Sequence, residues 1–310
     1  MSEKIIDVQD LSKSFGARAV FEHAAVSVEE GTTFGLVGLN GSGKTTFIRL
    51  LLGLLKPDRG SVRVLGFEPW KHEAAYYRRL GVILDHDGFA GNLTVSENLR
   101  IFAAAKEVSW RQALDYVEKY WAGTFIREEV FGGRGKVKYL SRGQKMQCAL
   151  CRAFLSRSRA YFFDEPTVSL DVDACDHFYS LVRREREAGS TVLISSHQLA
   201  AIEELCDSVG MLHGKTVTLL ASGTDASVPK PWVLRARPEE NVGAIIEALC
   251  NVPAAHYGGA WHFSVLNPDA AVPKLVNALV SAGCDIAEVR PELHSLKDRM
   301  RTRSRNGEGA

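Results

Sequence analysis

The sequence predicts an α/β fold, followed by a small α+β module. Its 310 residues are enough for one large core and a smaller second one. Short apolar runs typical of buried strands occur at residues 33–37, 161–163 and 191–196. Strand and helix patterns then alternate again, in shorter elements, after residue 231. The chain is therefore expected to form one large domain with a smaller domain at its carboxyl end.

Composition agrees with a globular protein and excludes several classes. Apolar residues make up 45% and charged residues 24% of the chain, close to the averages for soluble domains. The net charge of +1 provides no general attraction to nucleic acid, so no nucleic-acid partner is expected. No run of about 18 apolar residues is present, and the first ten residues lack the hydrophobic segment of a signal peptide. We expect a cytoplasmic protein.

The six cysteines are scattered, which predicts reduced thiols rather than a disulfide framework. Cys148 and Cys151 form a CxxC pair, a spacing also found in redox and metal sites. They lie within an apolar helical pattern, however, and small buried core residues are the favoured interpretation.

The first apolar run leads directly into a glycine-rich phosphate loop, and a helix is expected at residues 46–55. The loop has the pattern G-x-x-x-x-G-K-[ST]. Its residues are Gly38, Leu39, Asn40, Gly41, Ser42, Gly43, Lys44, Thr45 and Thr46. Its backbone N–H groups and the N-terminus of the following helix are expected to bind phosphates. Lys44 would contact the β and γ phosphates, and the Thr45 hydroxyl would bind Mg²⁺. The loop predicts a P-loop NTPase and leaves kinase, GTPase, helicase and transport ATPase open.

A second strand ends in two acids. Residues 161–163 are aromatic and apolar, Asp164 and Glu165 follow, and Pro166 prevents continuation of the strand ladder. Ligands of open parallel sheets bind beyond the carboxyl ends of the strands, so these acids should face the phosphate loop. Asp164 is then placed to hold Mg²⁺ through water, and Glu165 to act as general base on the attacking water.

A third strand, at residues 191–196, ends at His197. Its imidazole should reach the same sheet edge as the phosphate loop and the two acids. We interpret His197 as a sensor that donates a hydrogen bond to the γ-phosphate.

The segment Leu140-Ser141-Arg142-Gly143-Gln144 opens another predicted helix, and Ser141 precedes Asp164 by 23 residues. With this ordered set of motifs, residues 3 to about 220 resemble the ATPases of ABC transporters. The resemblance implies ATP and Mg²⁺ as ligands and a mixed sheet with a helical subdomain. It also implies a loop that ends at Asp171 and contacts a second ATPase.

The same resemblance assigns further residues. Phe15 stands where the family places an aromatic ring against adenine. Ser141, Gly143 and Gln144 belong to the element that completes the nucleotide site of a partner copy, which implies a homodimer or a paired ATPase subunit. Two positions depart from the usual pattern. Arg142 replaces a frequent glycine, which we expect to be tolerated, and Asp85 replaces a glutamine that contacts the metal.

The family pattern also predicts the domain organisation. Residues 1–224 should form the ATPase domain, and its helical subdomain, at about 88–155, should dock on a multi-span transmembrane permease at the inner face of the membrane. Residues 225–231 are read as a linker. Residues 232–304 follow the order βαββαβ of a split-βαβ module, which is similar to the end domains of two-component exporters. Residues 305–310 are expected to form a flexible tail.

Two other functions remain open from the sequence. One is an ABC-type ATPase that acts in translation or DNA maintenance without a membrane partner. The chain has neither a second phosphate loop nor a long heptad stretch, and this disfavours a role in translation or DNA maintenance. The other is a regulator that binds nucleotide without turnover. Retention of Lys44, Asp164, Glu165 and His197 argues against that function.

Overall fold

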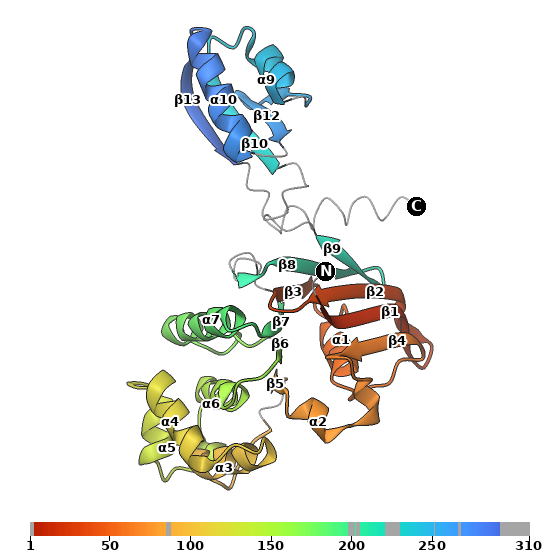
Figure 1. Ribbon diagram of the computed structural model, residues 1–310, viewed down its shortest axis with the longest axis vertical. Helices are drawn as coiled ribbons and strands as arrows, with labels where there is room; N and C mark the ends of the chain where they lie inside the picture. Colours follow the sequence, from red (N-terminus) through yellow and green to blue (C-terminus); the bar gives the residue numbers. More distant parts are fainter. Residues whose placement is uncertain are drawn as a thin grey trace. The chain divides into compact units, whose positions relative to one another are not determined.

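The computed structural model describes residues 3–84, 88–197, 202, 205–220, 230–250, 252–265 and 268–291. The chain divides after Leu220 into two compact units. Two of the three sheets belong to the first unit and the third to the second (Figure 1).

The central sheet of the first unit has six strands in the order β5-β6-β7-β3-β8-β9. All neighbouring pairs are parallel except β8 and β9, so the predicted mixed sheet is confirmed. Every residue of β3, β6 and β7 is buried, as expected for strands covered on both faces. The strands are β3 (Thr33–Gly38), β5 (Leu80–Ile83), β6 (Ala160–Asp164), β7 (Thr191–Ser196), β8 (Ser208–His213) and β9 (Thr216–Leu220).

A second, antiparallel sheet has the order β2-β1-β4, from β1 (Lys4–Phe15), β2 (Arg18–Glu29) and β4 (Arg59–Val64). Its inner side chains share one hydrophobic core with helix α1 (Lys44–Leu51) and with strand β3. Because α1 packs on both sheets, the position of its first turn, where the phosphate loop ends, is fixed from two sides.

The prediction for α1 was wrong at both ends. The helix begins at Lys44 rather than Thr46, and it ends at Leu51 rather than Leu55. Gly53 follows with a φ of 72°, a left-handed conformation that glycine adopts readily and that stops the helix. The apolar residues beyond Leu51 had suggested a longer helix.

Helices α3 to α6 lie along the sequence between β5 and β6 and gather in one part of the first unit (Figure 1). Three of them, α3, α4 and α6, begin with a capping box, in which a Ser or Thr side chain and a Glu or Gln side chain satisfy each other's backbone N–H groups. The remaining helices are η1 (Pro69–Lys71), α2 (Ala74–Tyr77), α3 (Val95–Ala105), α4 (Trp110–Tyr120), α5 (Phe125–Phe131), η2 (Val137–Tyr139), α6 (Arg142–Phe154) and α7 (Val172–Glu187).

Helices α6 and α7 cover the side of β6 opposite α1. Phe163 of β6 packs between Phe154 of α6 and Phe178 of α7, with ring centroids 5.4 Å away in each case. Cys148 and Cys151 are buried within α6 and form no disulfide, which confirms the prediction that they are core residues. Burial also raises the pKa of the Cys151 thiol well above its ordinary value, which keeps it unreactive.

Lys106, at the end of α3, provides a test of the packing between the helices and the central sheet. Its ammonium donates a hydrogen bond of 3.0 Å to Ser158 Oγ. Burial lowers the Lys106 pKa from 10.5 to about 8, so between these pH values the unfolded chain binds more protons than the folded one. The contribution of Lys106 to the free energy of unfolding therefore rises with pH between about 8 and 10.5. Below about pH 8 the folded protein keeps the Lys106 ammonium charged and buried.

We expect Lys106→Met to remove this pH dependence. The free energy of unfolding of the variant minus that of the wild type should fall as the pH rises from about 8 to about 10, with a slope of at most about 1.4 kcal/mol per pH unit. Urea unfolding at several pH values measures the difference. A difference that is constant with pH would show that Lys106 keeps its ordinary pKa in the folded protein.

The second unit has the element order βαββαβ, as predicted. Its four antiparallel strands have the order β11-β12-β10-β13, and α9 and α10 share one core with the sheet. This strand order is that of a split-βαβ module. The elements are β10 (Lys230–Arg237), α9 (Val242–Cys250), β11 (Ala255–Tyr257), β12 (Ala260–Val265), α10 (Pro268–Ser281) and β13 (Asp285–Pro291).

Several sequence-based expectations lie outside the described residues. They are Asp85, residues 225–229 of the predicted linker, residues 292–304 of the predicted end domain, and the tail. Within the described part of the chain, every helix is too short or too polar to cross a lipid bilayer.

Candidate active site

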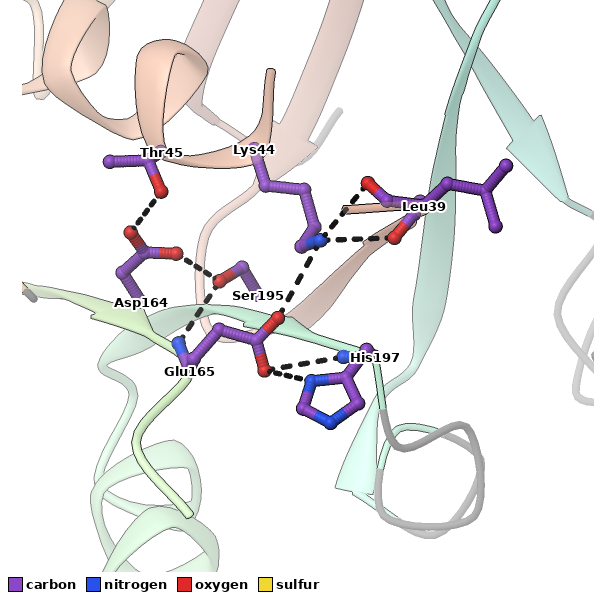
Figure 2. A network of polar contacts seen from close by, with 8 residues as sticks. Leu39, Lys44, Thr45, Asp164, Glu165, Ser195 and His197 are labelled. Atoms are coloured by element: carbon purple, nitrogen blue, oxygen red, sulfur yellow. Dashed lines mark hydrogen bonds and ion pairs between the residues drawn. The ribbon is translucent and has the colours of Figure 1, made fainter. Parts of the chain in front are cut away.

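The carboxyl ends of three adjacent strands meet at one edge of the central sheet. Strand β3 ends in the phosphate loop, β6 ends in Asp164 and Glu165, and β7 is followed by His197. Because β6 and β3 both pair in parallel with β7, these predicted residues come together (Figure 2). Phosphate loop, carboxylates and imidazole therefore form one polar network.

The phosphate loop depends on glycine at two positions. Gly41 has a φ of 77° and Gly43 a φ of 107°, values that side chains disfavour. A Cβ on Gly43 would also lie 2.8 Å from Val20 Cγ1, which is too close. The loop is closed by a hydrogen bond of 3.0 Å from the Ser42 N–H to the Leu39 carbonyl. A turn of this kind directs successive N–H groups inward, as phosphate binding requires.

Lys44 is the first residue of α1, and only 7% of its surface is exposed. Its ammonium donates hydrogen bonds to the carbonyls of Gly38, at 2.9 Å, and Leu39, at 3.5 Å. It also lies 3.5 Å from Glu165 Oε1. The cation is thus held directly above the loop in which phosphates would bind, and it joins the loop to the carboxylate of β6 (Figure 2).

Thr45 and Asp164 form the second link between α1 and β6. The Thr45 hydroxyl donates a hydrogen bond of 2.6 Å to Asp164 Oδ2, and Asp164 is only 5% exposed. A hydroxyl and a carboxylate are the hard oxygen donors that Mg²⁺ prefers. This pair therefore fits the predicted metal position. The described residues contain no separate cluster of three or more acidic, histidine or cysteine side chains with metal-site geometry.

Glu165 has an unusual backbone that directs its side chain along the sheet edge. Its φ is 50°, a left-handed conformation that is uncommon for a residue with a side chain. The carboxylate Oε2 lies 2.7 Å from His197 Nδ1 and accepts a hydrogen bond of 3.3 Å from the His197 N–H. The base predicted for water activation and the predicted phosphate sensor are therefore direct neighbours.

Two clefts open onto this network. One, of about 430 Å³, is lined by the phosphate loop together with Phe15, Arg18 and Val20. The Phe15 ring is half-exposed beside that loop, so it is available to a flat heterocycle. Arg18 was not predicted; its guanidinium donates a hydrogen bond of 3.5 Å to the Gly41 carbonyl. Its position three residues after Phe15 in the sequence was the only available signal.

The second cleft, of about 340 Å³, lies between the network and α6. Thr45, Asp164, Glu165 and His197 line one side of it, and the α6 residues Arg142 and Lys145 add two cations on the other. Arg142, which departs from the usual family pattern, is exposed there.

The Ser141 element is organised as a helix N-terminus. The Ser141 hydroxyl accepts a hydrogen bond of 3.2 Å from the Gln144 N–H, and the Gln144 side chain accepts one of 2.9 Å from the Ser141 N–H. A Cβ on Gly143 would lie 2.6 Å from the Ser169 carbonyl, so glycine lets α6 approach the loop after Glu165. Ser141 is exposed and lies outside the linings of both clefts described above.

Ser195 is a network member that the sequence did not single out. It is fully buried in β7, in register with Asp164. Its hydroxyl donates a hydrogen bond to Asp164 Oδ1 and accepts one of 3.1 Å from the Glu165 N–H. The only signal in the sequence is its place, because Ser195 is the next-to-last residue of the strand that precedes His197.

The segment that carries most of this network matches a known protein family. Residues 21–168 match the family described as ABC transporter. This segment runs from β2 through the phosphate loop and the Ser141 element to the loop after Glu165.

Curated relatives extend the match. The chain is 36% identical over 214 residues to the bacitracin transport ATP-binding protein BcrA of Bacillus licheniformis, covering 67% of each protein. It is 30% identical over 311 residues to the uncharacterised ABC transporter ATP-binding protein YdbJ of Bacillus subtilis (strain 168), covering 96% of this chain and 94% of YdbJ. It is 34% identical to the Nod factor export ATP-binding protein I of Bradyrhizobium diazoefficiens, covering 84% and 78%, respectively.

A solved structure also matches, described as the ATP binding subunit of an ABC transporter. Its TM-score is 0.66 at 28% sequence identity, and the match covers 72% of this chain and 91% of that chain.

Proposed function

Because this chain belongs to the ABC transporter family, among its ATP-binding subunits, we propose that it hydrolyses ATP with Mg²⁺ and thereby drives a separate membrane exporter. The observation that carries the proposal is the single network that joins Lys44 and Thr45 of the phosphate loop to Asp164, Glu165 and His197. This arrangement supports the proposal, because transfer of a γ-phosphoryl group to water needs a cation, metal ligands and a base close together.

The roles follow from the chemistry of these side chains. The phosphate loop and Lys44 would bind and orient the β and γ phosphates, since N–H groups and an ammonium balance their charge. Thr45 and Asp164 would hold Mg²⁺, which when bound neutralises charge on those phosphates. Glu165 would accept a proton from the attacking water. His197 would donate a hydrogen bond to the γ-phosphate, and its contact with Glu165 keeps both groups at the same edge.

We propose that the site is completed by a second copy of the chain. Ser141 and Gly143 lie at the N-terminus of α6, where unpaired N–H groups and the helix dipole favour an anion. Ser141 is exposed and is turned toward its own capping box rather than toward Lys44. Binding ATP between Lys44 of one copy and Ser141 of the other would close the pair, and hydrolysis would release it.

The remaining assignments stay proposals of the same kind. Phe15 would stack on adenine, Gln144 would support the Ser141 element, and Asp85 would contact the metal from a segment outside the described residues. Export is proposed because one relative is named as a Nod factor export protein, and a transport role because another is named for bacitracin transport. The permease would hold the chain at the cytoplasmic face of the membrane, docked on the helical subdomain at about residues 88–155.

A purification in mild detergent tests the membrane partner. Affinity-tagged chain, expressed in its native host and extracted with the membranes, should recover a protein with several transmembrane helices in stoichiometric amount. The same chain purified from the soluble fraction serves as the control for adventitious binding. Recovery of ribosomes or DNA without a membrane protein would contradict transport and favour an ABC-type ATPase of translation or DNA maintenance.

A further inference from the structure

We propose that Ser195 is a positioning residue for ATP hydrolysis, and that its hydroxyl couples the metal-side carboxylate of Asp164 to the backbone that carries Glu165. The inference rests on the proposed ATPase function and adds to it a buried residue that lines neither cleft.

The direction of both hydrogen bonds is fixed by chemistry. A backbone N–H can only donate, so the Ser195 oxygen must accept from the Glu165 N–H, at 3.1 Å. The serine proton is then free to go to the Asp164 carboxylate, which is an acceptor. The same Glu165 N–H also lies 3.1 Å from the Ser195 carbonyl, so one residue of β7 provides two acceptors for it.

The consequence for Asp164 is a fixed orientation. Its two carboxylate oxygens have different partners: Oδ1 accepts from Ser195 and Oδ2 from Thr45 (Figure 2). The hydroxyl of Ser195 therefore keeps Oδ2 facing the metal-side group of α1. Without it, the carboxylate could rotate about its terminal torsion, which has a broad energy profile.

The consequence for Glu165 concerns its backbone. A φ of 50° is held only where the surroundings fix it. The hydrogen bonds from the Glu165 N–H to Ser195 form this restraint at the point where β6 ends. Because Glu165 leaves the strand in this conformation, its carboxylate reaches both Lys44 and His197. Ser195 thus fixes the Asp164 carboxylate and the Glu165 backbone relative to each other.

Burial makes both hydrogen bonds of Ser195 costly to lose. Ser195 has no exposed surface, so water cannot replace a lost hydroxyl at either partner. Ser190 offers a matched control just before the other end of β7. It is equally a buried serine, and its hydroxyl donates a hydrogen bond of 2.7 Å to the Ser158 carbonyl, far from the phosphate-loop edge.

The test compares Ser195→Ala, Ser195→Thr and Ser190→Ala in the full-length protein. We expect Ser195→Ala to lower kcat about 10- to 100-fold and to raise the Mg²⁺ concentration for half-maximal binding of a fluorescent ATP analogue several-fold. The affinity for that analogue at saturating Mg²⁺ should change less than about threefold, because the phosphate loop is untouched. Ser195→Thr, which keeps the hydroxyl, should recover most of the activity. Ser190→Ala should keep kcat within about twofold.

Two results would overturn the inference. One is a Ser195→Ala protein with wild-type kcat and wild-type Mg²⁺ dependence. The other is an equal loss in Ser190→Ala, which would indicate a general effect of a lost buried hydrogen bond. If Ser195→Ala does not fold, Ser195→Cys keeps the shape with a weaker donor and should show the same losses, smaller in size. Failure of the proposed ATPase function would appear separately, as wild-type protein without turnover, and the Mg²⁺ dependence of binding would still decide the role of Ser195.

Discussion

Glu165→Gln should abolish ATP turnover while leaving ATP bound, with kcat lowered by about three orders of magnitude. Glutamine keeps the shape of the side chain and can still hydrogen bond to His197, which Glu165 contacts at 2.7 Å. It cannot accept a proton from water. Because Lys44, Thr45 and Asp164 are unchanged, binding of Mg-ATP should persist, and the two copies should remain closed around it.

Two measurements check this prediction. Phosphate release measures turnover, and size-exclusion chromatography with Mg-ATP should show a stable dimer that dissociates when Mg²⁺ is chelated. Glu187→Gln, at the exposed end of α7, is the matched control and should behave as wild type. A Glu165→Gln protein that hydrolyses ATP at the normal rate would refute the assignment of Glu165 as general base.

Lys44→Ala should weaken ATP binding itself, by about 10- to 100-fold in Kd, which corresponds to about 1.4 to 2.7 kcal/mol. Lys44 is 7% exposed and its ammonium lies against the carbonyls of the phosphate loop, so its charge acts in a site largely shielded from water. Alanine removes this charge and also leaves the nearby Glu165 carboxylate without its cation, at 3.5 Å in the wild type. Repulsion between that carboxylate and the phosphates should add to the loss.

Equilibrium binding of a fluorescent ATP analogue, titrated with and without Mg²⁺, measures the effect. Lys56→Ala, an exposed lysine just beyond the same helix, is the matched control and should leave Kd unchanged. Unchanged affinity in Lys44→Ala would count against the phosphate-loop interpretation. The two variants also separate the steps: Lys44→Ala should prevent the dimer that Glu165→Gln accumulates.

The strands and the site edge could be predicted because local patterns fixed them. Continuous apolar runs identified β3, β6 and β7, and parallel pairing necessarily places their carboxyl ends together. Lys44, Asp164, Glu165 and His197 were therefore expected at one edge, where the structure has them. The order βαββαβ of the second unit was likewise visible in alternating short patterns.

Features set by tertiary contacts could not be predicted in this way. The end of α1 at Leu51 follows from a left-handed Gly53, although apolar residues continue beyond it. The bridge made by Ser195 requires the exact register between β6 and β7, which no local pattern specifies. The partners of Lys44 are backbone carbonyls of its own loop, and these depend on the turn that the loop adopts.

The left-handed backbone of Glu165 has a consequence for how the protein evolves. Glycine would adopt that conformation with less strain, by roughly 1 kcal/mol, so folding stability alone favours glycine at this position. The carboxylate is therefore kept against the preference of the fold. Selection for thermal stability and selection for the proposed catalytic role of Glu165 would therefore pull this position in opposite directions.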